Sequence, residues 1–433
     1  MKINRMYRKR RWLFYLPVLL CCAAAIWYAA TVLMPLPPLK FTIAGGLPQG
    51  GYASLALRYR NQLELRGIQA DIIATDGALG PLKRLADPSS NVLAGFASGL
   101  AKEDKYLGVH ALAAVERQPV WIFTRLPSIT HLSQLKGHRI ATASAGTPGW
   151  NITQLLLAHA QVDAGDSVQQ LPTYGAVANQ LVEGRVEVAV IVASAHSEAV
   201  RLLLRNPAIQ IIGVDSVFSL IAREPRLKPF ILPQGAIDLR GEVPSHDLTL
   251  VSTNTNLLVR DSMHPALQRA LIDAARDLHE PAALLQRQGE FPNIRDVDFL
   301  PSAVARRADA GDRPMLEQLL PYYWAQWAQL LLFAIVPILL VTLLILLWIP
   351  NFFVWKVNAL LEHHYGELKF LEAEIVPSAT SMPNQLKKLM RRLDQIELQI
   401  AALDLPNQYA DRWYTLREHC ALAREKLLSY RAR

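Results

Sequence analysis

Three glycine-containing turns are the places in this 433-residue chain where backbone and side chains could bind a small molecule. They span residues 45–52, 75–80 and 144–151, and each precedes a segment with helical spacing of apolar residues. Glycine lets the backbone come close to a ligand, and the first N–H groups of a helix have no partner inside the helix. Because helix starts favour anions, the turns predict a pocket for a small carboxylate or amino acid.

The candidate binding residues are the glycines, hydroxyls, amides and aromatics of these turns. They are Gly46, Gln49, Gly51 and Tyr52 in the first turn, Thr75, Gly77 and Ala78 in the second, and Ser144, Gly146, Thr147 and Asn151 in the third, with Ser98 and Tyr174 added from neighbouring elements. Ordinary strand-to-helix turns use the same residue types, so a purely structural role stays open. Tyr52 and Trp150 could line the pocket or belong to the core. Asp76 could bind a ligand ammonium or hydrogen-bond within its own turn.

Residues that could do catalysis do not form a recognisable set. The sequence has no Gly-x-Ser-x-Gly elbow, no His-Glu-x-x-His zinc motif and no phosphate-binding Gly-Lys-Ser/Thr turn. The histidines of the middle segment, residues 40–318, are scattered singly. We therefore expect no catalytic activity, no metal and no cofactor. The net charge of +8 owes much to the basic start of the chain, so it does not predict binding to nucleic acid.

The turns connect elements that alternate between strand and helix. Apolar runs predict strands at 40–44, 70–74, 91–96, 119–125, 138–143, 186–192, 209–214 and 248–251, and helical spacing predicts helices at 52–66, 79–85, 132–137, 150–160, 174–183 and 265–278. This alternation is typical of a parallel sheet covered by helices.

The strand–turn–helix pattern starts twice, at residues 40 and 138, which predicts an α/β domain of two lobes. We place lobe 1 at about 40–130 and 248–318, and lobe 2 at about 131–247. Ligands of such sheets bind at the carboxyl ends of the strands, where all three turns lie. The domain has no cysteine, so its roughly 280 residues must be stable through their core alone.

Two uncharged apolar stretches enclose this domain. No Asp, Glu, Lys or Arg occurs from residue 12 to 39 or from 318 to 355, and about 20 apolar residues suffice to cross a bilayer. We predict transmembrane helices at 12–34 and 324–350, with a kink at Pro337. The basic residues in 1–11 predict a cytoplasmic N-terminus, so the domain at 40–318 lies outside the membrane and both chain ends lie in the cytoplasm.

The first span could instead be a cleaved signal peptide, but its apolar run is longer than a signal core, which favours an uncleaved anchor. A lipid-modified cysteine at Cys21 is disfavoured because Leu20 precedes it and such sites need a small residue there.

After the second span, residues 355–433 are rich in charge and follow helical periodicity. They predict an all-α tail of three helices, interrupted at Pro377 and continuing to about residue 430. Two roles stay open for this cytoplasmic tail: a structural or oligomerising stalk, or a part that reports lobe closure to a cytoplasmic partner.

Several of these segments resemble the TAXI family, the receptors of tripartite ATP-independent periplasmic (TRAP) transporters. The resemblance lies in residues 43–46 with 50–52, in the turns at 75–78 and 144–147, and in the helix–strand junction at 181–189, while residues 394–419 resemble the tail of the membrane-anchored subgroup. The chain differs from the family pattern at Ala44, Ala78 and Glu187, where that pattern has Thr, Ser and Asp.

The resemblance implies a two-lobed, periplasmic-binding-protein-like domain of type II that closes on a small organic acid or amino acid between its lobes. It also implies a two-pass protein of the bacterial inner membrane, with the domain in the periplasm and a TRAP permease as a possible partner. The alternative is a sensor or interaction protein that reuses the binding fold and signals through the second span to the tail.

Overall fold

The computed structural model describes residues 2–48, 50–76, 79–100, 106–145, 147–163, 167–378, 383–403, 405 and 409–431. Four of the predicted site residues, Gln49, Gly77, Ala78 and Gly146, lie outside these ranges. The chain divides into two compact units, one formed by residues 37–327 and the other by residues 1–36 together with 328–433.

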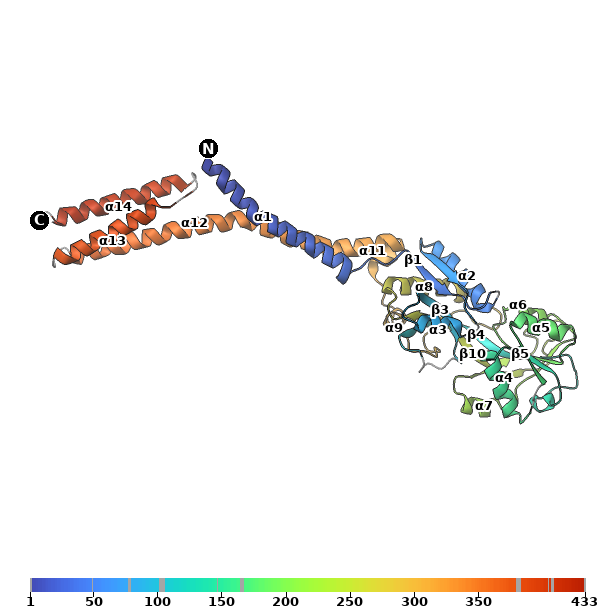
Figure 1. Cartoon of the computed structure of the whole chain (residues 1–433). Coiled ribbons are helices and arrows are strands. Elements are labelled where there is room, and N and C mark those ends of the chain that lie inside the picture. Colours follow the sequence, from blue (N-terminus) through green and yellow to red (C-terminus); the bar gives the residue numbers. More distant parts are fainter. Residues whose placement is uncertain are drawn as a thin grey trace. The chain divides into compact units, whose positions relative to one another are not determined.

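Strands and helices alternate along the first unit (Figure 1). The strands are β1 (Lys40–Ala44), β2 (Gln69–Ile73), β3 (Val92–Ser98), β4 (Val109–Thr124), β5 (Ile140–Ala143), β6 (Val168–Leu171), β7 (Val188–Val192), β8 (Gln210–Ile211), β9 (Lys228–Leu232) and β10 (Leu248–Arg260). The helices are α2 (Gly51–Glu64), α3 (Gly80–Ala86), η3 (Leu132–Leu135), α4 (Pro148–His159), α5 (Tyr174–Val182), α6 (Glu198–Leu204), α7 (Val217–Arg223), α8 (Pro265–His279), α9 (Ala303–Asp309), α10 (Met315–Leu319) and α11 (Tyr322–Leu330).

The same strand order occurs in each of the two lobes. In lobe 1 the order is β2-β1-β3-β10-β4, and in lobe 2 it is β6-β5-β7-β4-β8. In each lobe the first three strands are parallel, and a long strand arriving from the other half of the chain pairs antiparallel with the third. The predicted parallel sheet is therefore mixed, with β10 and β4 as the antiparallel members.

Strands β4 and β10 connect the two lobes. They pair with each other from Ser252 opposite Pro119 to Arg260 opposite Val109, and the register shifts twice along the way. Beyond this ladder, Val120 to Thr124 of β4 pairs with β7. Within it, Thr255 to Val259 of β10 pairs with β3 along its other edge. We call these two connecting strands the hinge strands.

The hinge strands are much longer than the sequence predicted. The expected strand at 119–125 begins at Val109, and the expected strand at 248–251 continues to Arg260. The prediction of a short β10 was wrong because its middle, from Thr253 to Asn256, is polar and gives no apolar pattern. Those four residues are nevertheless buried. The short elements β6, β9, α6, α7, α9 and α10 were also not predicted.

Each lobe has an apolar core on both faces of its sheet. In lobe 1, α2 and α8 cover one face around Tyr59, Leu63 and Leu271, and α3 covers the other. In lobe 2, α4 and α7 cover one face while α5 and α6 cover the other (Figure 1). Because helices cover both faces, the strand ends and the turns that follow them are polar edges that stay uncovered by the sheet-packing helices.

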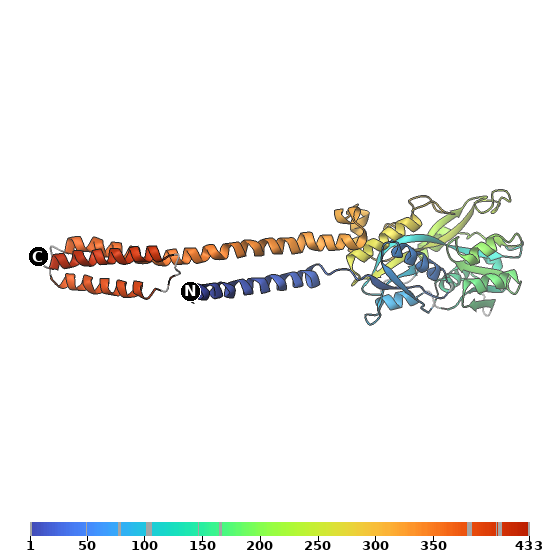
Figure 2. The same cartoon turned by 90° about the horizontal axis from the view of Figure 1, so that it is seen from above.

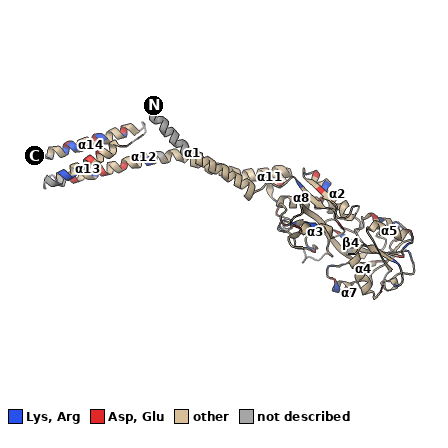
Figure 3. Cartoon of the chain, viewed as in Figure 1, with Lys and Arg blue, Asp and Glu red and all other residues tan. Residues whose placement is uncertain are grey.

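Two helical segments are long and apolar enough to cross a membrane: Phe14–Leu33, in the second unit, and Tyr322–Ile375, which begins in the last residues of the first unit and continues in the second. The first consists of α1 (Lys2–Tyr28) and a π-helix, η1 (Ala29–Leu33); the second runs through α11, the π-helix η5 (Leu331–Ile335) and α12 (Val336–Ser378). The irregularity at η5 lies directly before Pro337, where a kink was expected, because proline cannot donate a backbone hydrogen bond. Figure 3 shows the part of α1 that is not grey, and the first part of α12, almost without charge.

The tail is a packed three-helix structure. The end of α12 lies beside α13 (Pro383–Ala401) and α14 (Ala410–Arg431) in both views (Figure 2). Leu371, Leu393 and Leu416 are among the residues of its apolar core, and Arg424 forms ion pairs with Asp394 and Glu397. The tail therefore has a core of its own, and α12 ends at Ser378, one residue after the predicted break.

Candidate functional site

The first turn packs its glycine against a tyrosine. Gly46 has a positive φ of 71°, and a Cβ at that position would lie 3.3 Å from Cβ of Tyr52. The Thr75 amide donates to the Gly46 carbonyl at 2.8 Å, which ties the first turn to the second. Helix α2 starts after Gly50, whose position has no side-chain cap. Its first N–H groups therefore remain available to a ligand.

In the second turn, Thr75 is 8% exposed and its hydroxyl has no hydrogen-bond partner among the described residues. A Cβ on Gly80 would lie 2.7 Å from this hydroxyl oxygen, so the glycine is needed for the close approach. Asp76 is exposed.

In the third turn the two hydroxyls predicted to bind a ligand donate to the protein instead. Ser144 Oγ donates to the Leu171 carbonyl at 3.0 Å, and Thr147 Oγ1 donates to the Ser144 carbonyl at 2.8 Å. Thr147 also caps α4 by accepting from the amide of Trp150. The protons of both hydroxyls are therefore used in hydrogen bonds that hold the turn. The side chain of Asn151 is exposed.

Tyr174 connects the third turn to the first. Its hydroxyl lies over Gly149, where a Cβ would be only 2.3 Å from the phenolic oxygen. Tyr52 of lobe 1 lies close enough for Tyr174 to affect its ionisation. Burial raises the pKa of Tyr52 well above its usual value, with Tyr174 and Glu116 adding to the effect. The two predicted tyrosines, one from each lobe, therefore lie within electrostatic range of each other.

The hinge strands supply the remaining polar groups of this junction. The side chain of Gln118 and the backbone of Ser98 hydrogen-bond the Tyr52 hydroxyl, which opposes the rise of its pKa. Glu116 accepts from Thr255 Oγ1 at 3.3 Å, and Ser98 Oγ lies 3.5 Å from Thr253 Oγ1. We call Tyr52, Tyr174, Ser98, Glu116 and Gln118 the junction cluster. The sequence predicted its two tyrosines and Ser98, but Glu116 and Gln118 were missed.

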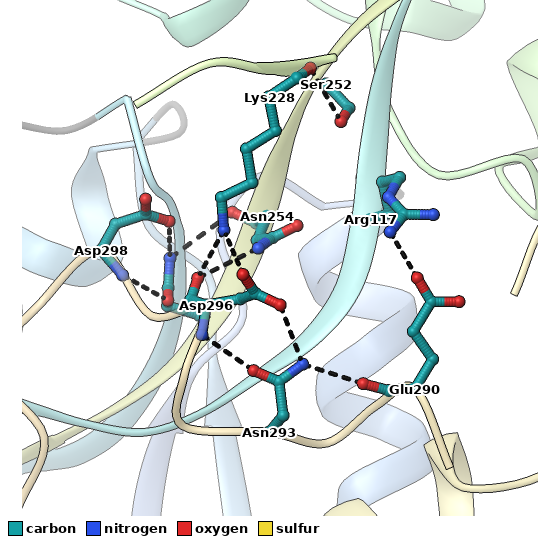
Figure 4. A network of polar contacts seen from close by, with 9 residues as sticks. Arg117, Lys228, Ser252, Asn254, Glu290, Asn293, Asp296 and Asp298 are labelled. Carbon is teal, nitrogen blue, oxygen red and sulfur yellow. Dashed lines mark hydrogen bonds and ion pairs between the residues drawn. The ribbon is translucent and has the colours of Figure 1, made fainter. Parts of the chain in front are cut away.

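The opposite face of the hinge carries a second polar network (Figure 4). Lys228, at the start of β9, donates to Asp296 Oδ1 at 2.9 Å, and Asn254 of β10 donates to the Asp296 carbonyl at 3.0 Å. Asn256 donates to Asp298 Oδ2 at 3.0 Å and accepts from the Asp298 amide. We call these residues, with Asn293, the interlobe network.

This network joins the two lobes. Phe230 and Leu232 of β9 pack in a lobe 2 core, whereas Val297 and Phe299, next to the network's aspartates, pack in lobe 1. Close by, Arg117 forms an ion pair with Glu290, and its guanidinium lies 5.2 Å from the ring centroid of Phe230. The hydrogen bond from Lys228 lowers the pKa of Asp296. The network therefore holds the lobes together from the face opposite the junction cluster.

Two pockets lie away from the junction in the described part of the chain. One, of about 60 Å³, is lined by charged residues of α8 and α10 such as Arg269, Asp273 and Glu317. The other, of about 580 Å³, is an apolar groove between α1 and α12 that includes Cys21 and Pro337.

No family model matches the chain, and no curated protein matches it. Among solved structures, MatC from Rhodopseudomonas palustris with bound malate is 16% identical, covers 67% of this chain and 96% of its own, and has a TM-score of 0.40. An ancestral arginine-binding protein bound to arginine is 14% identical over 56% of this chain and 92% of its own, with a TM-score of 0.37. The reduced OxyR regulatory domain from Pseudomonas aeruginosa is 12% identical over 56% and 97%, with a TM-score of 0.36.

The twofold strand order and the two crossing strands decide the fold class. Residues 37–327 form a periplasmic-binding-protein-like domain of type II. The expected architecture, this domain with two apolar helices and an all-α tail, is confirmed.

The contact between Tyr174 and Gly149 gives a prediction about the junction. Gly149→Ala places a methyl group where the phenolic oxygen lies, so we expect it to displace Tyr174 and lower the free energy of unfolding by about 1–3 kcal/mol. Gly175→Ala, at the corresponding second position of α5, meets only Thr173 Oγ1 at 3.8 Å and should be neutral or stabilising. Denaturant unfolding of both full-length variants in detergent tests this, and equal stability of the two would contradict the described contact.

The lowered pKa of Asp296 predicts how the interlobe network depends on pH. A carboxylate whose folded-state pKa is depressed stabilises the fold above its unfolded pKa of about 4, and this contribution is lost as the pH falls through the folded value. Asp296→Asn should therefore reduce stability at pH 7, by at most about 1 kcal/mol because the pair is half exposed. Unfolding at pH 7 and at pH 3 measures the difference between variant and wild type. A difference that persists unchanged at pH 3 would show that the ion pair is not its source.

Proposed function

We propose that this chain is a membrane-anchored receptor that binds a small organic acid or amino acid between the two lobes of its domain. The observation that carries the proposal is the junction cluster. Tyr52 from the first helix of lobe 1 is hydrogen-bonded by polar groups of the neighbouring strands and lies within electrostatic range of Tyr174 from lobe 2. Such clusters of convergent polar groups at strand ends are the usual binding positions of open α/β sheets.

The hinge gives the proposal a mechanism. Only β4 and β10 run through both lobes, so a small change in their backbone angles would rotate one lobe against the other. A ligand that contacts Tyr52 and Tyr174 together binds only the closed arrangement, and it therefore shifts the population toward closure.

The membrane attachment is part of the proposal. The basic segment 2–11 precedes the first apolar helix, which supports a cytoplasmic N-terminus and a domain on the periplasmic side of the inner membrane. The motifs shared with TAXI receptors support a TRAP permease as the partner that accepts the solute.

A second function, sensing, is favoured by one specific observation. Helix α12 runs without a break for 43 residues, from the second apolar segment into the packed tail. A receptor that delivers solute to a permease does not need such a cytoplasmic domain, whereas a sensor needs a continuous element that links the span to an output.

The binding proposal is tested on the full-length protein in lipid nanodiscs, screened against dicarboxylates and amino acids by thermal unfolding. A ligand at 100 times its Kd should stabilise the domain by about 2.7 kcal/mol. Tyr52→Phe and Tyr174→Phe each remove one hydroxyl contact, so each should weaken binding roughly three- to tenfold. Tyr414→Phe, in the tail, is the matched control. No stabilisation by any solute would contradict the proposal.

Deleting the chain after Lys356 separates the two functions. Solute binding should survive the deletion, because all residues of the junction cluster lie in the unit at 37–327. For a transport receptor, uptake of the bound solute by cells should survive as well. The sensor is supported instead if the deletion leaves solute binding unchanged but abolishes the response of cells to the solute. In that case the intact strain should also show no uptake of the solute.

A further inference from the structure

Large apolar side chains are exposed on the short helix that precedes the second apolar segment. Met315 and Leu319 of α10 are 77% and 74% exposed, and Trp324 and Trp327 of α11 are exposed as well. Single exposed apolar residues are common on soluble proteins, whereas several of them in succession mark a contact surface. The two tryptophans lie at the start of the segment Tyr322–Ile375, where interfacial aromatics of a membrane span are found.

Polar contacts fix which side of α10 faces the domain. Arg269 of α8 donates two hydrogen bonds to Glu317, from Nε at 2.7 Å and from Nη2 at 2.6 Å, and Gln326 of α11 donates a third at 2.7 Å. Glu317 lies midway between Met315 and Leu319 in α10. Because residues two positions apart on a helix are about 200° apart around its axis, both apolar side chains lie on the outer side of α10, away from lobe 1.

The end of α2 lies along the same helix of lobe 1. Asp273 and Asp277, one turn apart on α8, form ion pairs with Arg313, just before α10, and with Arg66, just after α2. Leu65, which precedes Arg66, is 80% exposed. The exposed leucine at the end of α2 and the exposed residues of α10 therefore belong to one side of lobe 1.

The connection from the first apolar helix reaches lobe 1 beside this leucine. Six residues separate η1 from β1, and the last of them, Leu39, is exposed. Its carbonyl accepts from the amide of Gln69 at 2.8 Å, which places it next to the turn that follows α2. The chain thus enters and leaves the domain on the side where these apolar residues are exposed. We call Leu39, Leu65, Met315 and Leu319 the apolar rim.

We propose that the apolar rim rests in the lipid at the outer surface of the membrane and holds lobe 1 against the bilayer. Two residues separate α10 from α11, so Leu319 lies within about 11 Å of chain from Tyr322, where the apolar segment begins. Apolar faces of interfacial helices are buried about 5–10 Å into the boundary between headgroups and acyl chains, a depth that Leu319 can reach. The inference rests on the membrane attachment in the proposed function.

This contact decides which lobe moves. The hydrogen bonds of Glu317 tie α10 to α8 and α11, so lipid bound to α10 also holds the core helix of lobe 1. Lobe 2 contributes no residue to the rim. Closure of the domain is therefore a movement of lobe 2 toward a lobe 1 that stays on the membrane.

Fluorescent probes test whether lipid covers the rim. We would attach bimane to single cysteines in the full-length protein, with the native cysteines replaced and one copy in each nanodisc. A phosphatidylcholine with a nitroxide near the top of its acyl chain quenches only probes that lie in the lipid. The probe at Leu319 should be quenched at least about half as strongly as one at Leu343 of α12, the positive control. A probe at Leu239, 87% exposed in lobe 2, should not be quenched.

A charged substitution then assigns the contact to the rim. With the probe at Met315, Leu319→Asp should reduce the quenching by at least about half, because a carboxylate disfavours burial in lipid. Leu239→Asp, an equally exposed leucine outside the rim, should leave it unchanged. Both positions are exposed, so neither substitution should alter the unfolding of the domain. Equal quenching in the two variants would show that the rim does not make the contact.

The outcomes separate the rim contact from the membrane attachment on which it rests. If the Leu343 probe is quenched and the Leu319 probe is not, the attachment stands and the rim contact is wrong. Blue-shifted emission of the Leu319 probe without quenching would also overturn the inference, because protein rather than lipid would then cover the rim. If the Leu343 probe is not quenched either, both proposals fail.

Discussion

The pairing of β4 with β10 is the interaction on which the rest of the domain depends. Strand β4 pairs with strands of both lobes, and β10 pairs with β4 from Ser252 to Arg260, so among the described residues their ladder is the backbone connection between the two sheets. Because side chains alternate along a strand, the hinge presents two different faces. Glu116 and Gln118 lie on the face of the junction cluster, whereas Arg117 between them lies on the face of the interlobe network.

These two faces have opposite chemical roles. On the network face, Lys228, Asn254 and Asp296 satisfy one another, and the cations and carboxylates are paired. On the junction face, Glu116 accepts only from hydroxyl groups, and the hydroxyl of Tyr59 has no hydrogen-bond partner among the described residues. Polar groups that are satisfied by the protein stabilise one arrangement of the lobes. Groups that are left unsatisfied cost free energy that a bound solute would recover, so under the proposed function closure would depend on the solute.

The sequence predicted the local parts of this site and not its long-range parts. Strand β1, the start of α2 and the tyrosines that follow two turns could be read from apolar spacing and glycine placement, since those signals are local. The hinge strands could not be predicted from such local signals. The buried Thr-Asn-Thr-Asn stretch at 253–256 is polar, and it is held by pairing with residues about 140 positions earlier. Glu116 was missed for the same reason. The hydroxyls of Ser144 and Thr147 were recognised, but their types could not reveal that the turn itself uses them.

The central claim, that the lobes close around a solute by bending at β4 and β10, is tested most directly by the distance between α2 and α5. Spin labels at Leu57 and Asn179, both exposed, can be introduced after replacing Cys21, Cys22 and Cys420, and pulsed electron resonance then gives the distance distribution. The account predicts two populations in nanodiscs without solute and a shift to the shorter distance when an amino acid binds. A single distribution that is identical with and without a bound solute would contradict it.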